Sequence, residues 1–117
     1  MAECFYHPED SKRLRQLRHL KPDAFKAFVD FERAVFQEGE LSVQVKELIA
    51  IATAHLTQCP YCIDVHTKRA KKAGATDGQI AEAIFVAMVL RAGGSFAHAA
   101  IAMRALDEVA QPKPGGS

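Results

Sequence analysis

Residues 42–74 read SVQVKELIAIATAHLTQCPYCIDVHTKRAKKAG, and this stretch decides the fold. Its Val, Leu, Ile and Ala residues recur at helical spacing and do not alternate with polar residues as in a strand. The opening serine suits the N-cap of a helix that runs to about Thr57. Pro60 suits the first position of the next helix, with Cys59 as its N-cap and Gly74 just past its end. We therefore predict two consecutive helices, with the cysteines at the start of the second.

The sequence before this stretch also indicates helices. A short amphipathic helix is expected over residues 8–20, where leucines recur on one side. Pro22 suits the first turn of another helix, whose phenylalanines and valines follow helical spacing until Gly39.

The sequence after it indicates two more helices. Thr76 and Gln79 resemble a capping box that opens a helix reaching Leu90 or Arg91. This helix is apolar on most of its surface, which predicts both a central place in a bundle and partial burial in an oligomer interface. After the glycine pair 93–94, Ser95 is expected to cap a last helix that ends near Ala110. The predicted class is all-α, a bundle of about six helices.

Length and composition indicate a single domain over residues 1–110, with a disordered tail at 111–117. The chain has 117 residues, 49% of them hydrophobic, and 15 basic against 14 acidic residues. A net charge of +1 gives no reason to expect nucleic-acid binding. No apolar run of membrane-spanning length and no secretory signal are recognised, so we expect a cytoplasmic protein without a membrane partner.

Cys59 and Cys62 carry the most informative chemistry. On adjacent turns their Cα atoms lie about 5–6 Å apart, which is a separation that a disulfide permits. Unpaired amides and the dipole at a helix N-terminus favour the thiolate, the reactive form of sulfur. In a reducing cytosol such a pair is typical of catalysis or metal binding rather than of a permanent crosslink. The third cysteine, Cys4, is expected to be an incidental free thiol.

His66 and Glu47 are placed to assist these thiols. His66 follows Cys62 by one helical turn, so its imidazole can act there as a base or cationic partner. Glu47 shares a face of its helix with two alanines, which allow the next helix to approach, and it is expected to reach His66. The N-cap position favours Cys59 as the reactive sulfur, whereas His66 favours Cys62. The residues alone leave this choice open.

Other uses of a Cys-x-x-Cys pair have less support. Glutaredoxins carry the same Cys-Pro-Tyr-Cys tetrapeptide after a β-strand, but an alanine-rich helical stretch precedes it here. Covalent haem attachment requires histidine directly after the second cysteine, where this chain has Ile63. Structural zinc requires four ligands, and the chain offers only His66, His55 or His98 beside the cysteines. We expect no bound metal.

The spacing as a whole is more specific than any of its parts. Glu47 is followed after twelve residues by Cys59, then by Cys62, and four residues later by His66. Around them stand KELIAIA at 46–52, CIDVH at 62–66, AKKAGAT at 70–76 and IAEA at 80–83. In these motifs the chain resembles the carboxymuconolactone decarboxylase superfamily, on its alkylhydroperoxidase AhpD-like branch, over about residues 22–108.

The resemblance implies an AhpD-like helical fold that assembles as trimers or hexamers, and a thiol peroxidase that reduces small organic hydroperoxides. It assigns peroxide attack to Cys62, resolution as a disulfide to Cys59, and proton transfer to His66 with Glu47. It also implies no bound cofactor and an external dithiol electron donor protein, such as a lipoylated carrier. The basic run at 68–72 is then either a solvated face or a docking surface for an acidic donor.

Tyr61 departs from the family pattern. The best-studied peroxidase branch has histidine at this place, and a phenol with a pKa near 10 cannot act as a base at neutral pH. The expected relay is therefore shorter, and activity lower or directed to another dithiol–disulfide exchange. His55 and His98 are further pocket candidates. Apolar walls are expected from Ile63, Val65, Phe85 and Met88.

Two other functions compete with the peroxidase. One is a decarboxylase-type lyase that uses Glu47 and His66 without sulfur chemistry, although true decarboxylases of the superfamily lack the cysteine pair. The other is a non-enzymatic, redox-responsive oligomer whose disulfide alters a partner surface.

Overall fold

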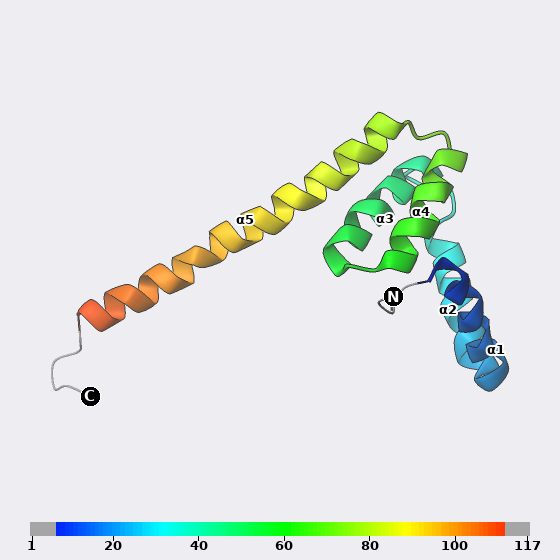
Figure 1. Cartoon of the computed structure of the whole chain (residues 1–117), viewed down its shortest axis with the longest axis horizontal. Coiled ribbons are helices and arrows are strands. Elements are labelled where there is room, and N and C mark those ends of the chain that lie inside the picture. Colours follow the sequence, from blue (N-terminus) through cyan, green and yellow to red (C-terminus); the bar gives the residue numbers. More distant parts are fainter. Residues whose placement is uncertain (1–6, 112–117) are drawn as a thin grey trace, which may run out of the picture.

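The computed structural model describes residues 7–111, which are helical almost throughout (Figure 1). No β-strand occurs in this part of the chain, so the all-α prediction is confirmed. Cys4 lies outside the described residues, and so does the predicted tail from residue 112 onward. The elements in order are the 3-10 helix η1 (Pro8–Arg15) and the α-helices α1 (Gln16–Leu20), α2 (Pro22–Val35), α3 (Val43–Thr57), α4 (Pro60–Lys72) and α5 (Asp77–Ala110).

Helices α3 and α4 lie side by side as a hairpin (Figure 1). Ser42 caps α3, as predicted, because its hydroxyl accepts the Val45 N–H. Gln58 then takes a left-handed conformation with φ 58°, and Cys59 N–H donates to Ala54 O at 3.1 Å. This tight link turns the chain back at once. The start of α4 therefore lies against the end of α3.

A small core joins this hairpin to the first part of α5. Ile51 and Ala70 are fully buried and pack with Ala75, where the chain turns into α5. Thr76 caps α5 through the predicted capping box, since it accepts the Gln79 N–H and its own N–H donates to the Gln79 side chain. Leu48, Ile80 and Ile84 complete the core from α3 and α5.

The predicted break at Gly93 and Gly94 is wrong, because α5 continues through both residues to Ala110. Ser95 therefore caps no separate helix, and α5 runs for 34 residues. Glycine disfavours a helix interior by roughly 0.5–1 kcal/mol relative to alanine. The alanine-rich sequence on both sides offsets this cost, so the local glycine signal does not end the helix.

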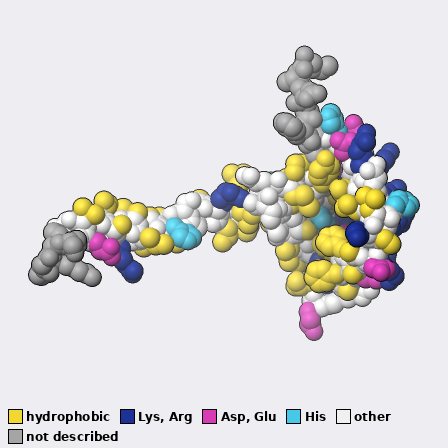
Figure 2. Space-filling view, turned by 90° about the horizontal axis from the view of Figure 1, so that it is seen from below, with side chains coloured by type: hydrophobic (Ala, Val, Ile, Leu, Met, Phe, Trp, Pro, Cys, Tyr) yellow, Lys and Arg dark blue, Asp and Glu magenta, His cyan; other side chains and the backbone are white. Residues whose placement is uncertain are grey.

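Most of α5 projects away from the other helices and is exposed (Figures 1 and 2). Phe96 and Val109 are 83% and 80% exposed. The chain has a radius of gyration of 21.2 Å, whereas a compact chain of this length would have about 13 Å. Within one chain, α5 is therefore not the centre of a bundle. By length and composition alone it could also cross a membrane, with an 18-residue window of mean hydropathy 1.6, so the expectation of no such run is corrected.

Two other helix boundaries differ from the prediction. The segment 8–20 is helical, but its first part is the 3-10 helix η1. Helix α2 ends at Val35 rather than at Gly39, and Phe36 leaves the helix as its C-cap with φ −91° and ψ 9°. This earlier end brings the Phe36 ring over α4, because the chain turns there toward α3.

The glycines provide a test of this fold. Gly93→Ala and Gly94→Ala should each raise the free energy of unfolding by about 0.5–1 kcal/mol, because an added Cβ meets nothing within 4 Å there. Gly74→Ala should lower it, because Gly74 has φ +93° and its Cβ would lie 3.3 Å from the Gln44 amide. Urea unfolding followed by circular dichroism measures both effects. Destabilisation by the two α5 substitutions would instead indicate a bend at the glycine pair or a close contact there with a second copy of the chain.

Candidate active site

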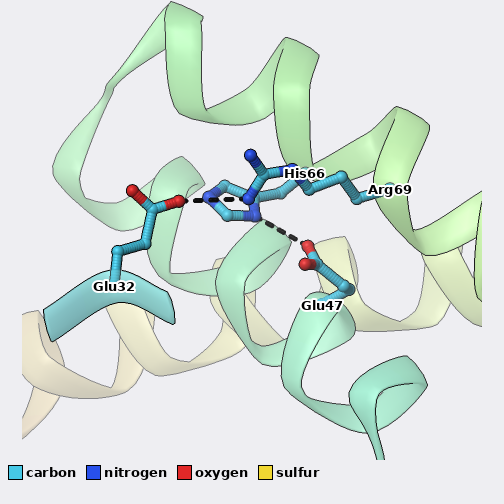
Figure 3. A network of polar contacts seen from close by, with 4 residues as sticks. All are labelled: Glu32, Glu47, His66 and Arg69. Atoms are coloured by element: carbon cyan, nitrogen blue, oxygen red, sulfur yellow. Dashed lines mark hydrogen bonds and ion pairs between the residues drawn. The ribbon is translucent and has the colours of Figure 1, made fainter. Parts of the chain in front are cut away.

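The contact between Glu47 and His66 lies at the centre of the site (Figure 3). Glu47 Oε2 on α3 lies 2.7 Å from His66 Nδ1 on α4, and the two side chains are 3% and 14% exposed. An ionised carboxylate only accepts hydrogen bonds, so Nδ1 carries a hydrogen and its N–H donates a hydrogen bond to Glu47. The other ring nitrogen, Nε2, is then the basic one. The structure thus brings the predicted pair together.

Phe36 covers one face of this histidine. The two rings stack with their centroids 5.2 Å apart and an interplanar angle of 18°. Sequence analysis assigned Phe36 only to the apolar side of a helix, and no local signal marks its role. The contact follows from the early end of α2.

A largely apolar pocket of about 450 Å³ opens beside the stacked rings. The end of α2 and the loop after it contribute Val35, Phe36 and Leu41. Helix α3 contributes a mostly apolar face that also carries one lysine, with the residues Lys46, Ile49, Ala50, Thr53, Ala54 and Thr57. Cys62 and His66 line the pocket from α4. A thiol and an imidazole thus face a space suited to a small apolar molecule.

The residues predicted to form the pocket walls are not the ones that line this pocket. None of Ile63, Val65, Phe85 and Met88 is among the residues that line this pocket. Phe85 and Met88 are exposed on α5, and Phe85 lies with Val86 and Val89 in a separate shallow hollow. The α4 face that carries Cys62 and His66 is turned toward α3 and the end of α2, so those elements supply the walls.

The two thiols are adjacent at the start of α4. Cys59 Sγ and Cys62 Sγ lie 2.6 Å apart as free cysteines, and Cys59 Sγ also accepts the Cys62 N–H at 3.3 Å. Cys59 is therefore the N-cap of α4, as predicted. Because the sulfurs are already adjacent, a disulfide would require only a small movement.

The thiol of Cys62 is not activated in the way that its place at a helix start predicts. Its pKa is raised to about 11, chiefly by burial and next by the hydrogen bond with Cys59. Charge on Cys59 and on Glu32 contributes to the same rise. At neutral pH Cys62 is therefore protonated, and any reaction of its sulfur needs a base to remove the proton.

The two remaining histidine candidates, His55 and His98, make hydrogen bonds within their own helices. His55 Nδ1 bonds to Ile51 O and His98 Nδ1 bonds to Gly94 O, each at 2.8 Å and one turn back on its own helix. Neither lines the pocket, and His98 is exposed on α5. Tyr61 is half-buried in the first turn of α4, likewise outside the pocket lining.

Within residues 7–111, no group of three or more His, Cys, Asp or Glu residues is arranged to hold a metal ion.

The basic run at 68–72 is largely paired with acidic residues of the same chain. Lys68 pairs with Asp64, Arg69 with Glu32, and Lys71 with Asp77. These contacts neutralise much of the charge that the docking interpretation relies on. The solvated-face interpretation agrees better with this arrangement.

A family model described as the carboxymuconolactone decarboxylase family matches residues 22–105. The chain belongs to this family. It is 44% identical over 102 residues to a Paracoccus denitrificans protein named "Uncharacterized protein 4 in cox locus", covering 87% of this chain and 92% of that protein. It is 32% identical over 99 residues to an uncharacterised Cupriavidus necator protein, covering 85% and 88%.

Solved structures agree with this family fold. A family member from Legionella pneumophila has a TM-score of 0.68 at 31% identity, with 88% of this chain and 92% of that one covered. A Methanobacterium thermoautotrophicum protein has a TM-score of 0.69 at 34% identity, covering 73% and 96%. Family membership does not by itself identify the reaction, so the reaction has to be inferred from the site.

The protonated state of Cys62 can be tested by titration. In a Cys4→Ser background, alkylation of Cys62 by iodoacetamide should accelerate with pH with a midpoint near pH 11, because only the thiolate reacts. Cys59→Ala should move this midpoint downward by removing the hydrogen bond and the charge. Peptide mass spectrometry reports the modified fraction. A midpoint near 9.0, the ordinary value, would contradict burial of the thiol.

Proposed function

We propose that this protein is a thiol-dependent peroxidase of the alkylhydroperoxidase-like type that reduces small organic hydroperoxides. The observation that carries the proposal is the pair of sulfurs 2.6 Å apart, one of which shares an apolar pocket with His66, the partner of Glu47. A dithiol supplies two electrons, which is what reduction of one peroxide bond consumes. A sulfur-independent lyase would leave this arrangement without a use.

The reaction proceeds in two steps. The Cys62 thiolate attacks a peroxide oxygen, so an S–O bond forms, the O–O bond breaks and the alkoxide leaves as an alcohol after taking up a proton. The Cys59 thiolate then attacks the sulfenic sulfur, so an S–S bond forms and water leaves. The peroxide is reduced by two electrons, and the dithiol becomes a disulfide. An external dithiol donor protein, such as a lipoylated carrier, restores the thiols.

His66 serves as the base that Cys62 requires. Its Nε2 takes the Cys62 proton during attack and passes it to the departing alkoxide. Glu47 fixes the tautomer and stabilises the imidazolium that forms in between. This pair does the work that a low thiol pKa does in other thiol enzymes, and it needs no histidine in the place of Tyr61.

The apolar pocket indicates the class of substrate, and the thiols indicate the cellular compartment. Apolar walls favour organic hydroperoxides over hydrogen peroxide, because they bury the alkyl group. The thiols require a compartment that returns them to the reduced state, which fits the cytoplasm.

The proposal is tested with reduced protein and one equivalent of cumene hydroperoxide. Rapid formation of a Cys59–Cys62 disulfide is expected, and His66→Gln should slow it about 100-fold because the proton acceptor is lost. Glu47→Gln should slow it less, since Nε2 remains. Stopped-flow consumption of peroxide and mass spectrometry of the peptides measure rate and product.

Single-cysteine variants assign the two roles. Cys59→Ser should accumulate a sulfenic acid on Cys62 that dimedone traps, while Cys62→Ser should be inert. A trapped sulfenic acid on Cys59 in Cys62→Ser would reverse the roles. Unreacted thiols in the wild-type protein would reject the peroxidase and favour the lyase.

We also propose that a second copy of this chain covers α5. The helix exposes large apolar side chains along its length, an area that stable chains bury. Assembly of copies would bury it and would account for the extended shape of the single chain. The trimer or hexamer implied by the resemblance is consistent with such a contact.

The assembly is tested by changing charge on α5. Phe96→Glu combined with Ile101→Glu should shift the sedimentation of the purified protein from oligomer to monomer, because two charges cannot be buried unpaired. Lys26→Glu on α2 is the control, since it adds negative charge away from α5. Wild-type protein that sediments as a monomer would overturn the proposal, as would recovery of the chain with membranes.

A further inference from the structure

A second ion pair links the helices that border the thiol pocket (Figure 3). Arg69 Nη1 on α4 lies 3.1 Å from Glu32 Oε1 on α2. Arg69 follows His66 by three residues, so the two side chains lie on the same side of α4. Glu32 precedes Phe36 by one turn of α2, and its carbonyl accepts the Phe36 N–H at 3.1 Å. The pair therefore joins the two segments that carry the stacked rings.

The end of α2 is anchored to the site by side chains. Lys46 donates to the carbonyl oxygens of Val35 and Gln37, at 2.7 and 2.5 Å, and fixes the backbone on either side of Phe36. The Phe36–His66 stack also links the end of α2 to the site, in addition to Lys46 and the Arg69–Glu32 ion pair. Because Val35 and Phe36 are pocket walls, the position of α2 sets the shape of the pocket.

Glu32 also acts on the sulfur through its charge. Its carboxylate contributes to the raised pKa of Cys62, beside burial and the effects of Cys59. The other charged or titratable groups around this thiol are His66 on α4 and Glu47 and Lys46 on α3. Arg69 carries the opposite charge to Glu32 and lies against it, so it reduces the field that Glu32 exerts on the sulfur.

We propose that Glu32 and Arg69 are positioning residues of the thiol site, which hold Phe36 over His66 and balance charge beside Cys62. The inference deepens the proposed function but does not require peroxide chemistry, since it concerns the reactivity of the thiol itself. It gives the chain a means of tuning Cys62 from outside the pocket.

An ordinary surface ion pair predicts something different. Arg69 and Glu32 are 47% and 38% exposed, and pairs of this kind contribute about 0–1 kcal/mol to stability. If the pair were merely structural, removing either partner would have the same small effect. If it balances charge at Cys62, the two removals act in opposite directions.

The experiment is alkylation of Cys62 across pH in the full chain, without peroxide, in a Cys4→Ser background. Glu32→Gln should raise the alkylation rate at pH 7 about threefold, because a negative charge near the thiolate is removed. Arg69→Gln should lower it by a similar factor, because the Glu32 charge is then unbalanced. The double variant should return toward the wild-type rate.

Two further measurements complete the test. Lys26→Gln breaks an exposed ion pair with Asp30 on the same helix α2 and should leave the rate unchanged. The nuclear magnetic resonance signals of the His66 ring should move in Arg69→Gln, as the Phe36 ring shifts over it. Equal rates in Glu32→Gln, Arg69→Gln and wild type, or shifts of one sign in both, would overturn the proposal. Loss of peroxide turnover with the opposite shifts intact would reject only the proposed function.

Discussion

The buried contact between Glu47 and His66 is the interaction on which the site depends. Glu47 is the buried charged residue in the described part of the chain, and a carboxylate taken out of water requires a partner. His66 provides it across the α3–α4 hairpin, and its other face receives Phe36 from the end of α2. Removing one member of such a pair typically costs about 3–5 kcal/mol, since the other is left buried and unpaired. Three helices thus meet at one imidazole.

The same arrangement shows how a protonated thiol could serve the redox chemistry that we propose. The raised pKa of Cys62 keeps its sulfur unreactive toward most electrophiles at neutral pH. In the proposed reaction, His66 removes the proton only when a substrate occupies the pocket and transfer is coupled to attack. Selectivity then comes from the geometry around His66, whereas an exposed thiolate would react with any electrophile. Cys59, which receives the amide hydrogen at the start of α4, is already placed to close the disulfide.

Features that depend on local sequence were predictable. Ser42, Cys59 and Thr76 cap helices through contacts within three residues, and each cap is present as predicted. The approach of Glu47 to His66 also followed, because small residues on α3 permit close packing. Features that depend on tertiary structure were not. The pocket walls and the pKa of Cys62 depend on which helices cover α4, and the glycine pair in α5 is a local signal that the surrounding alanines override.

The hairpin fixes the number of residues between the Glu47 carboxylate and the His66 imidazole. Residues of α3 before the turn are matched to residues of α4 after it, so Glu47 faces His66 across a link of two residues. Inserting one residue into α3 after Glu47 would rotate the carboxylate by about 100° relative to the turn and move it by about 1.5 Å along the axis. The carboxylate would then point away from α4. The interval of twelve residues from Glu47 to Cys59 is therefore fixed by the geometry of the hairpin.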